Sequence, residues 1–232
     1  MFDVKFDHHE PTAENIQTFW FKPTQPVRYT AGQFIELHLP HDKPDERGPK
    51  RWFTLSSSPE DKLISITTKI TPDCSSFKKT LASLEPGTKL KMASPMGDFV
   101  LPKDDSIPLL FVAGGIGCTP FHSIIKYLKD TGQKRDIRMI YAANTLEEVA
   151  FKSLFESLDK FEIILSDPPK DWQGKSGRIG AGVIQQASED SKRHIYLSGP
   201  EPMVEKLIEE LKSLGVDEKS IHGDYFPGYQ PI

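Results

Sequence analysis

The residues best suited to bind an anion lie in the segment FVAGGIGCTPF (111–121), between a predicted strand and a predicted helix. Its three glycines, Gly114, Gly115 and Gly117, would let the backbone approach a ligand closely. Thr119 suits the N-cap of the helix and Pro120 its first turn, so that unpaired N–H groups would face an anion. The pattern favours a dinucleotide pyrophosphate over a turn whose glycines serve packing alone.

A second candidate segment, RWFTLSSSP (51–59), combines a cation, two aromatic rings and four hydroxyls. Its β-prone residues predict a strand, but a strand that only packs would carry Val, Ile or Leu at its inward positions. The composition points to a partner that needs a positive charge, an aromatic face and hydroxyls within one short strand.

A third segment, LSGPEPM (197–203), has the same arrangement as the glycine loop. It places Ser198 at a strand end and Pro202 in the first turn of a predicted helix. Taken alone, it fits equally well a ligand site and a helix that is merely well capped.

The elements that must position these segments differ between the two halves of the chain. Before about residue 102 the hydrophobic period is two, in segments 15–21, 33–39, 51–55 and 63–68, which predicts strands. Residues 75–84 form the one helical stretch, and the polar segment 40–50 is predicted to be an exposed loop. An antiparallel sheet of this length usually closes into a barrel.

After a linker at 102–108, five strand-like segments alternate with helical ones, at 109–113, 137–143, 161–166, 194–199 and 221–226. This alternation predicts a parallel sheet covered on both faces, with ligands at the carboxyl ends of the strands. The expected fold is therefore an N-terminal antiparallel Greek-key β-barrel, residues 1–103, followed by a Rossmann-like α/β domain, residues 104–232.

Composition excludes several classes of protein. The 232 residues carry a net charge of −4, which gives no general attraction to nucleic acid or to an anionic membrane. Two cysteines cannot form a four-thiolate metal or iron–sulfur site, and the seven histidines show no ligand spacing, so no metal is expected. No apolar run approaches the ~20 residues of a membrane span, and the N-terminus is unlike a secretory signal. A cytoplasmic protein is expected.

Taken together, and in the order 51–59, 111–121 and 197–203 in which they follow one another along the chain, the three segments resemble the motifs of the ferredoxin–NADP reductase family of flavoproteins. Residues 51–54 resemble its flavin motif Arg-x-(Tyr/Phe)-(Ser/Thr), 114–120 its glycine loop, and 198–203 its Cys-Gly-Pro-x-Pro-Met element with serine in the first position. Two barrel segments, 31–34 and 94–101, are also similar to family elements. The resemblance spans nearly the whole chain.

The resemblance implies an FAD site on the barrel. Arg51 would pair with the flavin phosphates, the ring of Phe53 would lie on the isoalloxazine face, and Thr54 would hydrogen-bond the reactive ring nitrogen. A second phosphate contact would come from the start of the helix near residue 75. The implied FAD-binding residues are Arg51, Trp52, Phe53, Thr54, Thr67, Thr68, Lys69, Cys74, Ser75, Ser76 and Phe226. For Lys69, a solvated strand residue is an equally good interpretation.

It also implies an NAD(P)H site on the second domain. Ser198 and Asp224 would line the nicotinamide pocket, and Phe226 would stack over the flavin until the nicotinamide replaces it; with Thr54 these are the candidate catalytic residues. The implied coenzyme-binding residues are Gly114, Gly115, Ile116, Gly117, Thr119, Pro120, Asn144, Ser166, Asp167, Ser198, Gly199, Pro200, Glu201 and Pro202. Tyr229 and the tail around it have no secure counterpart in the family.

The implied activity is hydride transfer from NAD(P)H to FAD, with electrons passed to a separate acceptor such as ferredoxin, flavodoxin, a cytochrome or a small molecule. One alternative is an NAD(P)H-dependent free-flavin or ferric reductase, which uses flavin as a substrate. An alternative of another class is a non-catalytic flavin-binding subunit of an electron-transfer complex. NADH is favoured over NADPH, because Asp167 stands where NADP-using relatives commonly have arginine, although Asp167 could simply start the turn at Pro168 and Pro169.

Overall fold

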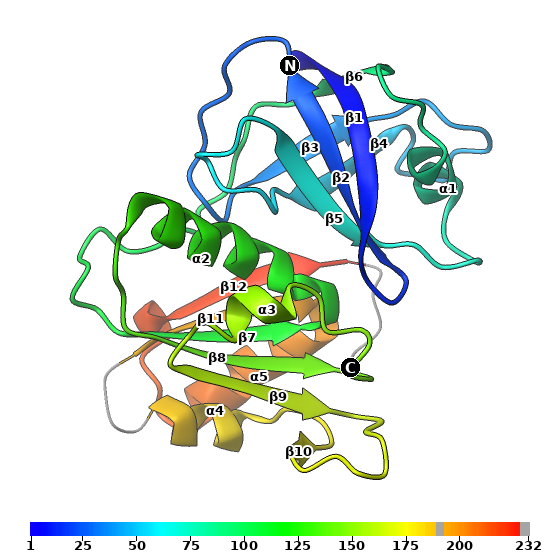
Figure 1. Ribbon diagram of the computed structural model, residues 1–232. Coiled ribbons are helices and arrows are strands. Elements are labelled where there is room, and N and C mark those ends of the chain that lie inside the picture. The colour runs from blue at the N-terminus through cyan, green and yellow to red at the C-terminus, as the bar shows by residue number, and fades with distance from the viewer. Residues whose placement is uncertain (189–192, 228–232) are drawn as a thin grey trace.

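The computed structural model describes residues 1–188 and 193–227 and contains two six-stranded sheets, one from each half of the chain (Figure 1). The N-terminal sheet is antiparallel and the C-terminal sheet is parallel with helices on both faces. This confirms the fold class predicted from the change of hydrophobic period. Within the described residues no helix is long and apolar enough to cross a membrane.

The antiparallel sheet has the strand order β4-β3-β6-β1-β2-β5. Its two edges meet next to the 51–59 segment, since Leu55 forms a bridge with Ile66 and Ser56 N donates to Ser65 O at 2.8 Å. The sheet thereby closes into the expected barrel, with helix α1 beside it. The elements are β1 (Phe2–Ala13), β2 (Ile16–Pro23), β3 (Phe34–His38), β4 (Lys50–Thr54), β5 (Ile64–Lys69), α1 (Ser76–Ala82) and β6 (Lys89–Met92).

The parallel sheet has the order β10-β9-β8-β7-β11-β12. Alternate residues of its central strand face opposite ways: Phe111 packs with residues of α2 and α3, whereas Leu110 and Val112 pack with residues of α4 and α5. The strands are β7 (Leu109–Gly114), β8 (Ile137–Ala143), β9 (Lys160–Leu165), β10 (Lys175–Ser176), β11 (His194–Pro200) and β12 (Ile221–Phe226). The helices are α2 (Thr119–Thr131), α3 (Lys152–Phe155), α4 (Ala181–Ser188) and α5 (Glu201–Ser213), with short 3-10 turns η1 (Gly115–Cys118) and η2 (Glu218–Ser220).

The start of α2 differs from the sequence prediction by one residue. The glycine loop already turns as the 3-10 helix η1, so Cys118 occupies the N-cap position and Thr119 is the first helical residue. The Thr119 hydroxyl donates back to Ile116 O at 3.2 Å instead of capping the helix. Pro120 lies in the first turn, as expected.

Two backbone carbonyls of the 51–59 segment hold the barrel against α2. Nδ1 of His122 donates to Ser56 O and Oγ of Ser123 donates to Ser57 O, both at 2.6 Å. Burial lowers the pKa of His122 to about 4, so the ring is neutral at ordinary pH. All three serines of the segment are buried, and their hydroxyls bond within the barrel and its turn: Ser56 Oγ contacts Ser65 Oγ, Ser57 Oγ accepts from Ser65 N, and Ser58 Oγ accepts from Glu60 N. They therefore do not face a ligand.

Candidate functional site

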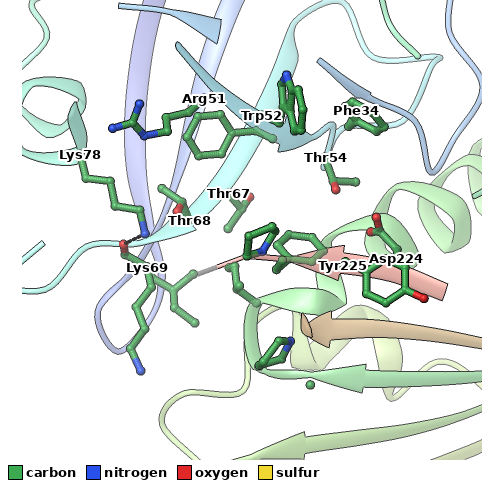
Figure 2. Close-up of a pocket in the computed structure, with 18 of the residues that line it drawn as sticks. Phe34, Arg51, Trp52, Thr54, Thr67, Thr68, Lys69, Lys78, Asp224 and Tyr225 are labelled. Carbon is green, nitrogen blue, oxygen red and sulfur yellow. Dashed lines mark hydrogen bonds between the residues drawn. The ribbon is translucent and has the colours of Figure 1, made fainter. Parts of the chain in front are cut away.

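A pocket of about 870 Å³ lies between the barrel and the parallel sheet. Its barrel wall comes from β4, β5 and the start of α1, and its other wall from the loops at the carboxyl ends of β7 and β8 and from β12. This is the edge at which open parallel sheets bind their ligands. Figure 2 shows the side chains that converge on it.

The flavin-side residues predicted from the sequence gather on this pocket, with the exception of Ser76. Ser76 Oγ donates to Asp42 O instead. The pocket is lined by Arg51, Trp52, Phe53, Thr54, Thr67, Thr68, Lys69, Cys74, Ser75 and Phe226. Among these residues only Trp52 is exposed, with 69% of its surface accessible, and its Nε1 donates to Glu36 Oε2 at 3.2 Å.

The hydroxyls of the barrel wall are not equivalent. Thr67 Oγ1 donates to Ser56 Oγ and contacts Thr18 Oγ1, both at 2.8 Å, so it is fully used within the barrel. Thr54 lies at the end of β4 and is almost buried, and its side chain points toward the pocket opposite Asp224 (Figure 2). Thr54 is therefore the hydroxyl that a ligand at the centre of the pocket would meet.

One end of the pocket is cationic. Arg51, Lys78 and Lys69 lie along this end in Figure 2, and Arg47 also lines the pocket. Ser75 is the N-cap of α1, and its Oγ accepts from Lys78 N at 3.5 Å. Cations beside a helix start suit phosphate groups.

The opposite end carries the carboxyl of Asp224, which is hydrogen-bonded to a buried hydroxyl of the neighbouring strand. Ser198 of β11 and Asp224 of β12 are register partners, and Ser198 Oγ donates to Asp224 Oδ2 at 3.2 Å. Ser198 is fully buried. Burial, with a smaller contribution from the charge of Asp98, raises the pKa of Asp224 to about 7 against the lowering effect of the Ser198 hydrogen bond. A carboxyl with a pKa near neutrality can change its charge during turnover.

Only some of the predicted coenzyme residues line the pocket. Gly114, Gly115, Ile116, Asn144 and Pro200 line the pocket. Those that do not line it are Gly117, Thr119, Pro120, Ser166, Asp167, Ser198, Gly199, Glu201 and Pro202.

Gly117 has a packing role that the sequence did not reveal. A Cβ atom at this position would lie 2.2 Å from Ser198 O, so only glycine lets the loop after β7 pack against the end of β11. The close approach predicted for the glycines is therefore, at this position, an approach to the chain's own backbone. It brings Ser198 next to the glycine loop.

A chain of polar side chains joins the barrel to the two coenzyme loops. Lys69 Nζ lies 2.6 Å from Glu148 Oε1, and Asn144 Nδ2 donates to Glu148 Oε2 at 3.0 Å. Ser166 Oγ donates to Asn144 Oδ1, also at 3.0 Å. Lys69 is thus ion-paired, in contrast to the solvated strand residue that was the alternative interpretation.

The last strand brings two aromatic rings to the pocket. Phe226 is partly buried against the core that contains Phe111 and Phe121, whereas Tyr225 is 44% exposed. Both line the pocket. Tyr229 lies outside the described residues.

Sequence reasoning missed several lining residues that come from other elements. Glu148 and Asp98 lie near predicted motifs, but nothing in the sequence assigned their carboxylates to the pocket. Arg47 lies in the segment predicted to be an exposed loop. Lys78, one turn into α1, could have been found from its spacing to Ser75. The lining residues not assigned from the sequence are Ile16, Phe34, Arg47, Thr71, Asp73, Lys78, Asp98, Glu148, Gly223, Tyr225 and Pro227.

Comparisons with known proteins agree with this geometry. Residues 111–208 match the family profile described as the oxidoreductase NAD-binding domain. The chain is 28% identical over 225 residues to the glycine betaine monooxygenase reductase subunit of Chromohalobacter salexigens, covering 91% of this chain and 60% of that protein. It is 32% identical over 202 residues to one of the subunits of the Na⁺-translocating NADH-quinone reductase of Neisseria meningitidis, covering 77% and 49%.

Two solved structures share the fold over their whole length. The FAD/NAD-binding domain of a nitric oxide dioxygenase from Vibrio cholerae superposes with a TM-score of 0.82 at 21% identity, covering 97% of this chain and 98% of that one. A ferredoxin NADP⁺ reductase from Neisseria gonorrhoeae with bound FAD and NADP gives 0.78 at 18% identity, covering 98% of both chains.

A closed antiparallel barrel beside an NAD-binding parallel sheet defines the class of two-domain, dinucleotide-binding reductases. Within that fold, residues 111–208 match the oxidoreductase NAD-binding domain, and the whole chain has the fold of a ferredoxin NADP⁺ reductase. It spans about 60% of the length of the first of the relatives above.

The residues on the pocket fit FAD. The cationic end and the capped start of α1 suit its phosphates, and the largely apolar middle with Phe53 and Thr54 suits a planar ring system. The Ser198–Asp224 pair and the glycine loop lie at the other side of the pocket, where they suit the nicotinamide coenzyme.

Proposed function

We propose that this chain is an FAD-dependent reductase that takes a hydride from NAD(P)H and passes the electrons to a separate acceptor. The observation that carries the proposal is the pocket at which the flavin-side residues of the barrel meet the Ser198–Asp224 pair of the parallel sheet. FAD would accept the hydride and release electrons, which is chemistry that no side chain supplies. The chain's own task is to hold two planar rings in contact and to exclude water.

The proposed roles follow from place and chemistry. Arg51 and the α1 start at Ser75 bind the phosphates, Phe53 supports the ring face, and Thr54 orients the ring by a hydrogen bond. Asp224 lines the nicotinamide side and is held by a hydrogen bond from the buried Ser198. In its charged form Asp224 would stabilise the positive charge that develops on the nicotinamide as the hydride leaves.

The barrel, residues 1–103, is proposed as the FAD-binding domain and residues 104–232 as the coenzyme-binding domain. The printed names of the relatives, a monooxygenase reductase subunit and a quinone reductase subunit, support an acceptor outside this chain. That acceptor would be a protein such as ferredoxin, flavodoxin, a cytochrome or an oxygenase, or a small molecule. A cytoplasmic location stays a prediction from the sequence.

A second candidate is an NAD(P)H-dependent free-flavin or ferric reductase. It is favoured by one observation, the contact of Arg51 Nη2 with both carboxylate oxygens of Asp45, since Arg51 is proposed to bind the flavin phosphates. A non-catalytic flavin-binding subunit, the third candidate, is less consistent with the Ser198–Asp224 pair beside the pocket.

The test is an absorbance spectrum of the purified protein, identification of the flavin released by heating, and anaerobic titration with NADH. The proposal expects bound FAD whose absorbance bleaches with NADH. Protein that purifies colourless yet oxidises NADH only with added flavin supports the second candidate, and bound flavin that NADH does not bleach supports the third.

Thr54 offers a matched pair of variants for the same assay. Thr54→Ala removes the hydroxyl and should slow the bleaching about three- to tenfold, since one hydrogen bond is worth about 0.5–1.5 kcal/mol. Thr54→Ser keeps the hydroxyl and should react at close to the original rate. Equal rates for the two variants would argue against the role of Thr54.

A further inference from the structure

The segment 40–49, expected to be only an exposed loop, contacts both positions proposed for the flavin phosphates. Its Asp45 contacts Arg51, its His41 and Asp42 contact Ser76, and its Arg47 lines the pocket. We call residues 40–49 the strap. It connects β3 to β4, and β4 carries Arg51 on the barrel wall of the pocket.

The contact with Arg51 uses the face of the guanidinium that a phosphate would use. Nη2 of Arg51 donates to both carboxylate oxygens of Asp45 at 2.8 Å, while Nη1 donates to the carbonyl oxygens of Gly48 and Lys50 at 2.9 and 2.6 Å. The guanidinium also lies over the ring of Phe77, 4.9 Å from its centroid. The Arg51 side chain is only 10% exposed, so the carboxylate and a phosphate would compete for the same few donors.

The second contact holds the strap at the start of α1. Ser76 Oγ donates to Asp42 O, and Nδ1 of His41 lies 3.0 Å from the same hydroxyl. Nε2 of His41 lies 3.2 Å from Gly48 O, on the far side of the strap. The strap is therefore fixed at two points, one beside Arg51 and one beside the helix start.

Asp45 cannot be released by ordinary changes of pH. Hydrogen bonds from Arg47, together with the charges of Arg51 and Arg47, lower its pKa to about 2. The carboxylate stays charged wherever the protein is folded and working. A ligand must displace it by offering Arg51 a better anion, which a dinucleotide phosphate with more negative charge can do.

We propose that Asp45 is an affinity-determining residue that competes with the flavin phosphates for Arg51, so that the strap must release Arg51 when FAD binds. This inference rests on the proposed function. The affinity of the strap for Arg51 would then determine whether FAD stays bound to the protein or exchanges with free flavin.

The test compares Asp45→Asn with Glu46→Gln, an equal change of charge at the next, exposed residue of the strap. Flavin is removed from each full-length protein, and the dissociation constants of FAD and of riboflavin, which has no phosphate, are measured by fluorescence quenching. We expect Asp45→Asn to bind FAD about three- to tenfold more tightly than the original protein. Riboflavin affinity, and FAD affinity in Glu46→Gln, should not change.

An Arg51→Ala background makes the test specific, because Asp45→Asn should then have no effect on FAD affinity. Unchanged FAD affinity in Asp45→Asn, or an equal gain for riboflavin, would overturn the inference and leave the proposed function standing. Failure of every variant and of the original protein to bind FAD would refute the proposed function, and the inference with it.

Discussion

Lys69 Nζ lies 2.6 Å from Glu148 Oε1, and this ion pair joins the last residue of β5 in the barrel to the loop after β8 in the parallel sheet. The two side chains are 28% and 15% exposed, so the pair is screened less than one at the open surface. Through its second oxygen, Glu148 also holds Asn144, which in turn accepts from Ser166. The barrel and both coenzyme loops therefore share one polar network.

The first prediction concerns this ion pair. Glu148→Gln should lower the free energy of unfolding by about 0.5–1.5 kcal/mol, because Lys69 loses its charged partner while Asn144 keeps an acceptor. Urea denaturation measures it. Glu147→Gln is the control, because Glu147 is exposed and makes the same change of charge. Equal stabilities of the two variants, or an unchanged effect of Glu148→Gln in a Lys69→Met background, would contradict the role of the pair.

The second prediction concerns the rate of flavin reduction as a function of pH. Burial raises the pKa of Asp224 to about 7, so its carboxyl is neutral below that pH and charged above it. If the charged form stabilises the nicotinamide cation, the rate of flavin bleaching by NADH should rise through about pH 7, whereas Asp224→Asn should react slowly at every pH. Stopped-flow measurements decide, and a rise that persists in Asp224→Asn would assign it to another group.

The same shift predicts how stability depends on pH. The native state holds the Asp224 proton more tightly than the unfolded state does, so the charged carboxyl destabilises the fold increasingly from about pH 4 to pH 7. Asp224→Asn lacks this penalty. At about pH 8 it should be more stable than the original protein by about 1–3 kcal/mol, and below about pH 4 the difference should vanish. A difference that does not change with pH would contradict the raised pKa.

The third prediction concerns Phe226, the ring proposed to leave when nicotinamide binds. Phe226→Ala should tighten coenzyme binding about two- to tenfold and slow coenzyme release, because an aromatic contact worth about 0.5–1.5 kcal/mol no longer has to be broken. Tyr225→Ala is the control, since Tyr225 lines the same pocket but is more exposed. Stopped-flow kinetics with NADH measures both. Unchanged affinity and turnover in Phe226→Ala would mean that this ring does not cover the flavin.

How far the sequence predicts the fold depends on how many residues of an element face the core. Strands β8 and β12 match the predicted segments 137–143 and 221–226 residue for residue. Strand β6 has only two buried residues, Leu90 and Met92, too few to show a period. In β1 the inward residues Phe2, Val4 and Phe6 alternate, but the strand continues through an exposed half, where no inward apolar residue marks it.

The site divides in a similar way. Residues that lie next to one another in a motif, such as Arg51 and Thr54, could be assigned from the sequence to one pocket. Asp45 and Glu148 could not, because their contacts with Arg51 and Lys69 depend on how a loop folds back and on how the two sheets dock. The hydroxyls of Ser56–Ser58 belong to the same segment as Arg51 and Thr54, but they bond within the barrel and the turn at Pro59, so membership of the segment does not by itself place a side chain on the pocket.

The final prediction is that NADH is used with higher catalytic efficiency than NADPH. Asp167 N donates to Asn144 O at 2.8 Å, so the loops after β8 and β9 are tied together at the place where the coenzyme ribose is expected. The Glu148 carboxylate and the Ser166 hydroxyl both contact Asn144 there, and Asp167 is the exposed residue next to Ser166. They would accept hydrogen bonds from ribose hydroxyls but repel the ribose phosphate of NADPH, which adds about −1.5 to −2 of charge by analogy with other phosphate monoesters.

The test of this preference is steady-state kinetics with both coenzymes in three proteins. In the original chain, NADH should give the higher kcat/KM. Asp167→Arg should narrow the gap about tenfold or more, because it replaces a repelling charge with a phosphate partner. Asp171→Arg makes the same change at an exposed position of the same loop and should leave the ratio unchanged. A higher efficiency with NADPH in the original chain would refute the preference, and equal effects of the two substitutions would show that Asp167 acts only through the net charge of the loop.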